Sequence, residues 1–153
     1  MTSDVMGGGG AMDFLIEGVD ATVAGGEHYT PRVIESLPQL KVIARAGVGF
    51  DRVNVEAASA HQVAVTVTPT SNHESVAELT LALLFAVTKR IVVNDRAVRA
   101  GDWPTDLLMP IRGQTFGILG LGRIGRSTAI RARALGMDVL ACEKFPQQDF
   151  VKE

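Results

Sequence analysis

The sequence of 153 residues lacks several features that mark particular protein classes. Its one cysteine, Cys142, excludes an internal disulfide framework and a metal site built from several cysteines. With 15 Lys and Arg against 17 Asp and Glu, the net charge of −2 leaves no electrostatic footprint for nucleic acid or an anionic membrane. The longest nearly uninterrupted apolar run, residues 79–87, is far shorter than the about 20 residues of a membrane-spanning helix. We therefore expect no nucleic-acid partner and no membrane partner.

The start of the chain also lacks a targeting segment. Residues 1–14 contain neither the positive region nor the apolar region of a secretory signal, so we expect a cytoplasmic protein. Four consecutive glycines at residues 7–10 predict a flexible leader. They do not predict a phosphate loop, because no strand precedes them and no helix follows.

Short apolar segments alternate with helical segments in the first part of the chain. Strands are predicted at residues 20–25, 41–44 and 63–67, and helices at residues 31–37 and 53–60. Thr30 suits the N-cap of the first of these helices, and Pro31 suits its first position. Alternation of strands and helices indicates a parallel sheet with crossover connections. The predicted fold class is therefore α/β.

Residues 68–72 interrupt this alternation and predict a boundary between residues 1–70 and residues 71–153. Ser75 and Glu78 have the spacing of a capping box for a helix that runs through Arg90. That helix is apolar on nearly every side, so we expect it to be buried all round, between two domains or two subunits. Further elements are predicted at residues 94–100 (helix), 116–119 (strand), 123–135 (helix) and 138–142 (strand).

A glycine-rich motif, GLGRIG, occupies residues 120–125 between a predicted strand and a predicted helix. In this context a G-x-G-x-x-G pattern predicts a dinucleotide site. Gly120 permits the tight turn, Gly122 lets backbone approach a pyrophosphate, and Gly125 lets the helix pack closely on the strand. The alternative is a glycine-rich turn in a generic α/β domain. The predicted cofactor-binding residues of this region are Gly120, Gly122, Arg123, Ile124, Gly125 and Glu143.

Glu143 ends the second strand of this region and indicates which dinucleotide is preferred. Its carboxylate would accept hydrogen bonds from the adenosine ribose hydroxyls, and its charge would repel a 2′-phosphate. The sequence therefore favours NAD over NADP, a preference that the neighbouring Lys144 weakens slightly. We interpret most arginines of the preceding helix as its solvated face.

Four blocks in order resemble the D-isomer-specific 2-hydroxyacid dehydrogenases, and among them the phosphoglycerate dehydrogenase-like branch. The blocks are LKVIARAGVGFDRVNVEAA, TSNHESVAELTLALLFAVTKRI, the turn GDW, and GQTFGILGLGRIGRSTAIRARALGMDVLACEKFP. The resemblance implies a partial flavodoxin-like substrate lobe at residues 1–70, followed by the first half of a Rossmann NAD-binding lobe at residues 71–153 that includes the interdomain helix. It also implies NAD-dependent oxidation of a D-2-hydroxy acid and a homodimer through residues 75–110.

The resemblance further implies a substrate site. Gly47, Val48 and Gly49 match a loop that closes over the substrate carboxylate with backbone amides, and Arg45 matches a position that holds a phosphate or carboxylate. Asn72 matches the residue facing the substrate side of the nicotinamide pocket, and Thr80 matches a cofactor contact. The alternatives are purely structural roles: a surface charge for Arg45, a helix cap for Asn72, and a hydroxyl bonded to its own backbone for Thr80.

No catalytic residue and no metal site are predicted. The resemblance places the catalytic Arg, Glu and His of the family beyond the last position that this sequence matches. His73 and Glu74 are adjacent and expected to face different ways, so they are predicted not to pair as a base and its orienting carboxylate. His28 and His61 are expected in loop or surface positions, and Cys142 is expected to be a small buried residue. The chain alone is therefore expected to bind NAD weakly and to catalyse no turnover.

Two alternatives remain open. One is a non-catalytic NAD-sensing or partner-binding protein of the corepressor type on the same fold. The other is a different Rossmann enzyme, such as a homocysteine-releasing hydrolase or an alanine dehydrogenase, against which the block NHESVAEL argues.

Overall fold

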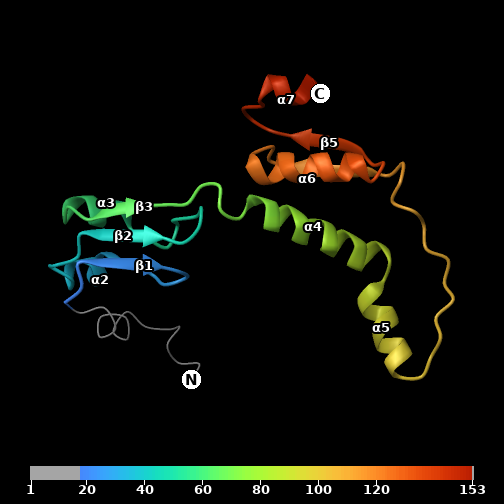
Figure 1. The fold of residues 1–153 in the computed structure, drawn as a ribbon, viewed down its shortest axis with the longest axis horizontal. Helices are drawn as coiled ribbons and strands as arrows, with labels where there is room; N and C mark the ends of the chain where they lie inside the picture. The colour runs from blue at the N-terminus through green and yellow to red at the C-terminus, as the bar shows by residue number, and fades with distance from the viewer. Residues whose placement is uncertain (1–17, 153) are drawn as a thin grey trace. The chain divides into compact units, whose positions relative to one another are not determined.

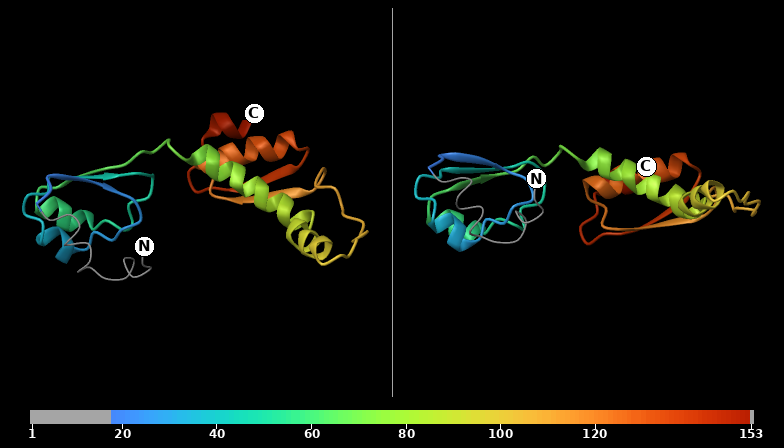
Figure 2. Two further views of the ribbon diagram at one scale, coloured as in Figure 1. Left: turned by 60° about the horizontal axis from the view of Figure 1, so that its bottom comes forward. Right: turned by 90° about the horizontal axis from the view of Figure 1, so that it is seen from below.

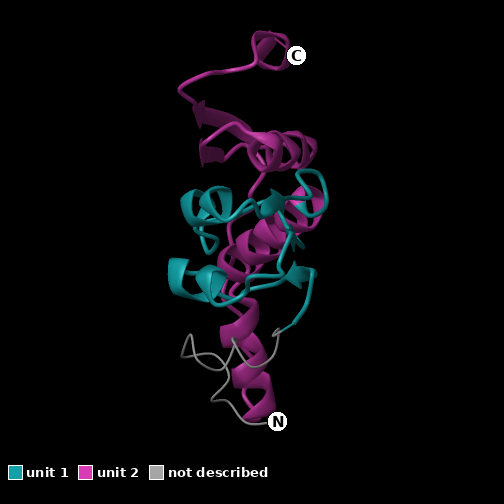
Figure 3. Ribbon diagram, turned by 90° about the vertical axis from the view of Figure 1, so that its left-hand side faces the viewer, with its two compact units in different colours: residues 1–72 teal, residues 73–153 magenta. Residues whose placement is uncertain are grey.

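The computed structural model describes residues 18–152 (Figure 1). The chain divides into two compact units at Asn72, residues 1–72 and 73–153 (Figure 3). The division falls between Asn72 and His73, two residues after the position expected from the sequence. The glycine tract at residues 7–10 lies outside the described residues.

The first unit is built around a three-stranded parallel sheet in the order β1-β2-β3 (Figure 1). Its elements are β1 (Ala21–Ala24), α2 (Pro31–Glu35), β2 (Val42–Arg45), α3 (Val55–Ala60) and β3 (Ala64–Thr66). The prediction of an α/β fold with parallel strands is confirmed. Since parallel neighbours need crossover connections, each pair of strands is joined through a helix.

Local sequence explains where these helices begin. The Thr30 hydroxyl accepts a hydrogen bond from Val33 N–H at 3.4 Å, and Pro31 occupies the first helical position, as predicted. Asn54 caps α3 by accepting from Ala57 N–H at 2.8 Å. Both helices lie on one face of the sheet (Figure 2), where their apolar side chains and those of the strands form the core. Its fully buried members include Val33, Ile34, Ile43 and Ala58.

The second unit pairs two parallel strands, with Leu119 beside Cys142 at their carboxyl ends. Its elements are α4 (His73–Thr88), α5 (Ile91–Arg99), β4 (Thr115–Leu119), α6 (Arg123–Ala134), β5 (Asp138–Cys142) and α7 (Gln148–Lys152). Helix α6 covers one face of the strand pair and packs against α4 on its other side (Figure 2). The short helix α7 has no counterpart in the sequence prediction.

Helix α4 departs from the prediction at its start. It begins at His73, so Ser75 lies inside the helix and cannot be its N-cap. Within this chain Ala77 is its one fully buried residue, and Leu79, Leu83 and Val87 are exposed, so the expected burial on all sides between domains or subunits stays a prediction. These side chains are exposed because α6 and α5 cover only part of the surface of α4. Within residues 18–152, no helix is long and apolar enough to cross a membrane.

The face of the β4–β5 pair opposite α6 is uncovered in the described structure. Leu119 and Leu140 are 92% and 69% exposed, and Cys142 is exposed beside them. The expectation that Cys142 is buried is therefore wrong. A single helix can cover only one face of a sheet, and side chains at alternate strand positions point to the other.

Candidate functional site

The glycine motif forms the turn between β4 and α6. Gly120 adopts a φ of +92°, a left-handed conformation that glycine reaches without strain, and its N–H donates to the Cys142 carbonyl at 2.8 Å. Gly122 is the N-cap of α6, and a Cβ added there would meet no atom within 4 Å. The space above Gly122 is thus open, as close approach of a ligand to the main chain requires.

Gly125 has the opposite surroundings. A Cβ at this position would lie 2.1 Å from the Gly120 carbonyl oxygen, far inside van der Waals contact. The absence of a side chain is what allows the first turn of α6 to sit directly on the loop. The backbone N–H groups of that turn have no acceptor within the helix, and the positive end of the helix dipole faces the open space.

Leu121, between the two flexible glycines, is anchored at three points. Its side chain is 7% exposed and packs in a core cluster with Ile118 and Ala129. Its N–H donates to Oε2 of Glu143 at 2.7 Å, and its carbonyl accepts from Nη1 of Arg126 at 3.0 Å. The loop is therefore held in one conformation by the protein itself.

The Glu143 carboxylate lies at the carboxyl end of β5, where the sequence predicted an acceptor for ribose hydroxyls. Its Oε1 atom accepts from Phe145 N–H at 3.0 Å, while Oε2 accepts from Leu121. These backbone hydrogen bonds, the one from Phe145 foremost, hold the pKa of Glu143 below its ordinary value, and the Arg126 charge acts in the same direction. The carboxylate is thus ionised at neutral pH.

The other residues predicted for the cofactor are spread along α6 and α4. Arg123 and Ile124 are exposed residues in the first turn of α6. Thr80 donates its hydroxyl to the Val76 carbonyl at 2.8 Å, which is the backbone-bonded arrangement stated above as its alternative. Asn72, which was predicted for the substrate, is exposed and immediately precedes α4.

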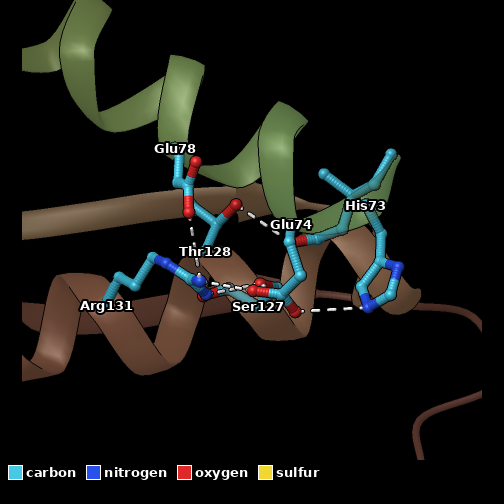
Figure 4. Close-up of polar contacts among 7 residues, drawn as sticks. His73, Glu74, Glu78, Ser127, Thr128 and Arg131 are labelled. Atoms are coloured by element: carbon cyan, nitrogen blue, oxygen red, sulfur yellow. Dashed lines mark hydrogen bonds and ion pairs between the residues drawn. The ribbon is translucent and has the colours of Figure 1, made fainter. Parts of the chain in front are cut away.

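A polar cluster fastens α4 to α6 behind this loop (Figure 4). Glu74 accepts from the Ser127 hydroxyl at 3.0 Å and forms an ion pair with Arg131, which also donates to Ser127 Oγ at 2.6 Å and lies 3.9 Å from Glu78. The Arg131 hydrogen bond, followed by that from Ser127, lowers the pKa of Glu74. Arg131 is therefore not part of a solvated face, and Arg126 is not either, because both guanidinium groups are bonded within the protein.

His73 and Glu74 correct a further prediction. The Nε2 atom of His73 lies 3.2 Å from Oε1 of Glu74, so the two side chains do meet (Figure 4). They occupy the first two positions of α4, where no preceding turn separates neighbouring side chains. The contact does not activate Ser127 as a nucleophile. In a catalytic triad the histidine lies between the serine and the carboxylate, whereas here the Ser127 hydroxyl donates directly to the Glu74 carboxylate.

The other residues predicted for the substrate lie in the first unit, at the carboxyl end of β2. Arg45 is half-buried, and its Nη1 atom donates to the Ala24 carbonyl at 2.9 Å and the Ala46 carbonyl at 3.2 Å. Gly47 is buried with a φ of +153°, and its carbonyl accepts from Thr68 N–H at 2.9 Å. Val48 and Gly49 continue the loop on the surface. The four predicted residues thus come together in one strand-end loop.

Sequence reasoning missed the role of Arg126. Its partner Leu121 is five residues earlier and lies outside the helix, so no helical spacing rule connects them. The sequence signal that could have revealed this role is an arginine in the second turn of a helix that directly follows a glycine loop.

Comparisons with known proteins agree with this geometry. Residues 12–148 match the model of the family described as D-isomer specific 2-hydroxyacid dehydrogenase, catalytic domain. A D-3-phosphoglycerate dehydrogenase of Mycobacterium leprae is 44% identical over 115 residues, which are 74% of this chain and 22% of that protein. A glyoxylate reductase of Korarchaeum cryptofilum is 39% identical over 127 residues, 79% of this chain and 38% of that protein.

Solved structures are similar as well. The D-lactate dehydrogenase of Aquifex aeolicus, complexed with NAD and lactic acid, has a TM-score of 0.82 and 26% identity, covering 92% of this chain and 43% of that one. The strand–loop–helix geometry defines an α/β protein with parallel strands. This chain belongs to the D-isomer specific 2-hydroxyacid dehydrogenase family. The chain spans less than half the length of each of these relatives.

Proposed function

We propose that this chain carries the NAD site of an oxidoreductase acting on the CH–OH group of a D-2-hydroxy acid. The observation that carries the proposal is the glycine loop, which is open above Gly122 and closed beneath Gly125. Unpaired N–H groups at the start of α6 and the helix dipole suit the phosphates of a dinucleotide. The family match supports the same reaction class.

We propose that the two units have separate functions, substrate binding and NAD binding, as the resemblance implies. We assign the unit ending at Asn72 to a partial flavodoxin-like substrate lobe. The unit beginning at His73, with α4 as interdomain helix, is assigned to the first half of a Rossmann NAD-binding lobe.

The residues present fit NAD. Bound NAD would supply a nicotinamide that exchanges a hydride with the substrate carbon. Gly122 and the first turn of α6 would hold the pyrophosphate, and Arg123 would lie beside it. Each Glu143 oxygen accepts one backbone N–H and keeps a lone pair for a ribose hydroxyl. The negative charge of Glu143 opposes a 2′-phosphate, which favours NAD over NADP, and Thr80 remains a proposed contact.

For the substrate we propose a 3-phosphoglycerate-like or a glycerate- or hydroxypyruvate-like acid. Main-chain N–H groups in the loop formed by Gly47, Val48 and Gly49 would meet its carboxylate. Arg45, at the base of this loop, would favour a phosphorylated or otherwise dianionic molecule, and Asn72 would face the same side. The phosphoglycerate dehydrogenase and glyoxylate reductase relatives support this substrate class.

Catalysis needs more than these groups. Reduction of a 2-keto acid requires a cation on the carboxylate, an acid at the ketone oxygen and a carboxylate that orients the acid. We assign the acid and its orienting carboxylate to no described residue, since the Glu74 carboxylate is already bound by Ser127 and Arg131. We therefore propose that the 153-residue chain alone binds NAD weakly and does not turn over substrate.

The test is calorimetric titration of the purified chain with NAD, using two matched glycine variants. A Cβ at Gly122 or at Gly117 meets nothing within 4 Å, so Gly122→Ala and Gly117→Ala should fold alike. Gly122→Ala should lower NAD affinity about tenfold by pushing the pyrophosphate off the main chain, a loss of about 1.4 kcal/mol, and Gly117→Ala should leave affinity unchanged. Equal affinity in both variants would overturn the site. Micromolar NAD binding with turnover of 3-phosphoglycerate or glyoxylate would overturn the expected inactivity.

We also propose that the chain forms a homodimer through residues 75–110. The support is the apolar surface left exposed there: Leu83 and Val87 on α4, and Trp103 and Leu107 in the extended segment after α5. A surface of this kind on a monomer marks a place where another chain packs.

A further inference from the structure

The peptide groups of Leu121 are held from opposite directions. Its N–H is bound by the Glu143 carboxylate at 2.7 Å and its carbonyl by the Arg126 guanidinium at 3.0 Å. Its neighbours Gly120 and Gly122 are the two residues of the loop with the most conformational freedom. Fixing Leu121 therefore restrains the loop between these two glycines, in addition to the hydrogen bond from Gly120 N–H to the Cys142 carbonyl.

Arg126 is itself held in place. It is half-buried on the second turn of α6, and its guanidinium carbon lies 5.9 Å from the ring centroid of Phe150 on α7. This is within the range of a cation–π contact. The guanidinium thus bridges α6, the glycine loop and α7, and its position is set before any ligand arrives.

We infer that Arg126 is a positioning residue for dinucleotide binding: with Glu143 it clamps the Leu121 peptide and holds the glycine loop in its binding conformation. The inference rests on the proposed NAD site. A loop ordered in advance loses less conformational entropy when its ligand binds, which raises affinity without adding a contact. Arg126 therefore acts through Leu121 and touches no part of the cofactor.

Within the clamp, the charge of Arg126 also affects the protonation of Glu143. The positive guanidinium adds to the backbone hydrogen bonds in lowering the pKa of Glu143. The charged groups of the neighbouring segments are Arg123, Arg126, Arg131 and Arg133 on α6, Asp138 on β5, Lys144 beside Glu143, and Asp149 and Lys152 on α7. Removing Arg126 should thus shift the titration of Glu143 upward, and the N–H that donates to this carboxylate reports that titration.

The experiment uses the full chain and four variants of α6. Arg126→Gln and Arg126→Met remove the charge, Arg126→Lys retains it, and Arg133→Gln is the matched control because Arg133 is exposed on the same helix. The pH dependence of the Leu121 amide resonance is followed by NMR, together with hydrogen exchange at that amide, NAD affinity by calorimetry and the thermal unfolding midpoint.

In both neutral variants we expect the titration midpoint at Leu121 to rise, its amide to exchange faster, and NAD affinity to fall about tenfold, the effect of losing one charge-assisted hydrogen bond. Arg126→Lys should recover part of the affinity, and Arg133→Gln should match the wild type. If Arg126→Gln fails to fold, Arg126→Met carries the same measurements.

The outcomes separate the inference from the proposed function. Unchanged titration and exchange at Leu121 in the neutral variants would overturn the clamp. If Arg126→Gln binds NAD with the same affinity as the wild type, the positioning role alone would be overturned. A wild-type chain that does not bind NAD would overturn the proposed function, and the positioning role with it.

Discussion

Gly122 and Gly125 are three residues apart on one turn of helix, yet the lack of a side chain serves different ends at each. At Gly122 it leaves open space above the main chain, whereas at Gly125 it avoids a collision with the Gly120 carbonyl. The first glycine concerns what can approach the loop from outside, and the second concerns how the loop and helix fit together.

Gly125→Ala should therefore destabilise the protein, although alanine is normally the better helix former. The added Cβ would lie 2.1 Å from Gly120 O, and relieving such a backbone overlap costs about 1–3 kcal/mol. Chemical denaturation should give a lower free energy of unfolding for Gly125→Ala than for the wild type. Gly117→Ala, whose Cβ meets nothing within 4 Å, is the control. A Gly125→Ala variant as stable as the wild type would mean that the loop and α6 are not packed as described.

Single residues also show where prediction from sequence succeeds. The tight turn at Gly120 and the close packing at Gly125 were predictable from the motif and its position between a strand and a helix, because each is a requirement of the local backbone. The Arg126–Leu121 hydrogen bond and the His73–Glu74 contact depend on side-chain paths around the start of a helix. No periodic rule specifies such paths, so the sequence did not reveal them.

At the scale of elements, the position of α6 is set by more than its apolar face. The cluster of Glu74, Ser127 and Arg131 ties the middle and last turn of α6 to the start of α4 (Figure 4). Ser127 is buried and fully bonded, so the cluster orders the contact between the two helices. Because the glycine loop begins α6, this contact also bears on the loop.

The cluster predicts a pH dependence of stability. The folded pKa of Glu74 lies below its ordinary value of 4.5, so its contribution is complete above that value and is lost as the pH falls through the lowered pKa. The thermal midpoint of the wild type should drop on acidification from pH 7 to below 4.5, and that of Glu74→Gln should drop less. Glu35→Gln, a carboxylate of α2 in the other unit, should behave as the wild type does. An identical acid response in Glu74→Gln would show that the ion pair does not stabilise the fold.

The elements themselves were largely predictable. Capping at Thr30 and the alternation of strands and helices gave the parallel α/β arrangement, because both are properties of short segments. The exposure of α4 and of Cys142 was not predictable, because burial depends on which other elements cover a surface.

On the scale of the whole molecule, the main feature is apolar surface that the described chain does not bury. The exposed residues of α4, the segment after α5 and the uncovered face of the β4–β5 pair belong to this surface. Burying such surface is worth about 25 cal/mol per Å², which gives association a driving force.

The homodimer proposal makes a direct prediction at this scale. Leu83 is 57% exposed in the middle of α4, and Leu83→Glu would place a charge in an apolar contact at a cost of several kcal/mol if that contact exists. Sedimentation equilibrium should give a dimer for the wild type and a monomer for Leu83→Glu. Val23→Glu, at an exposed position of β1 in the other unit, should remain dimeric. A monomeric wild type at high concentration would contradict the proposal.

The contrast between Gly122 and Gly125 bears on how variation in this chain can be surveyed. A screen that scores only cellular abundance would register substitutions at Gly125 and pass over those at Gly122, while a screen for ligand capture would register both. Comparing the two screens position by position would therefore separate residues kept for architecture from residues kept for recognition.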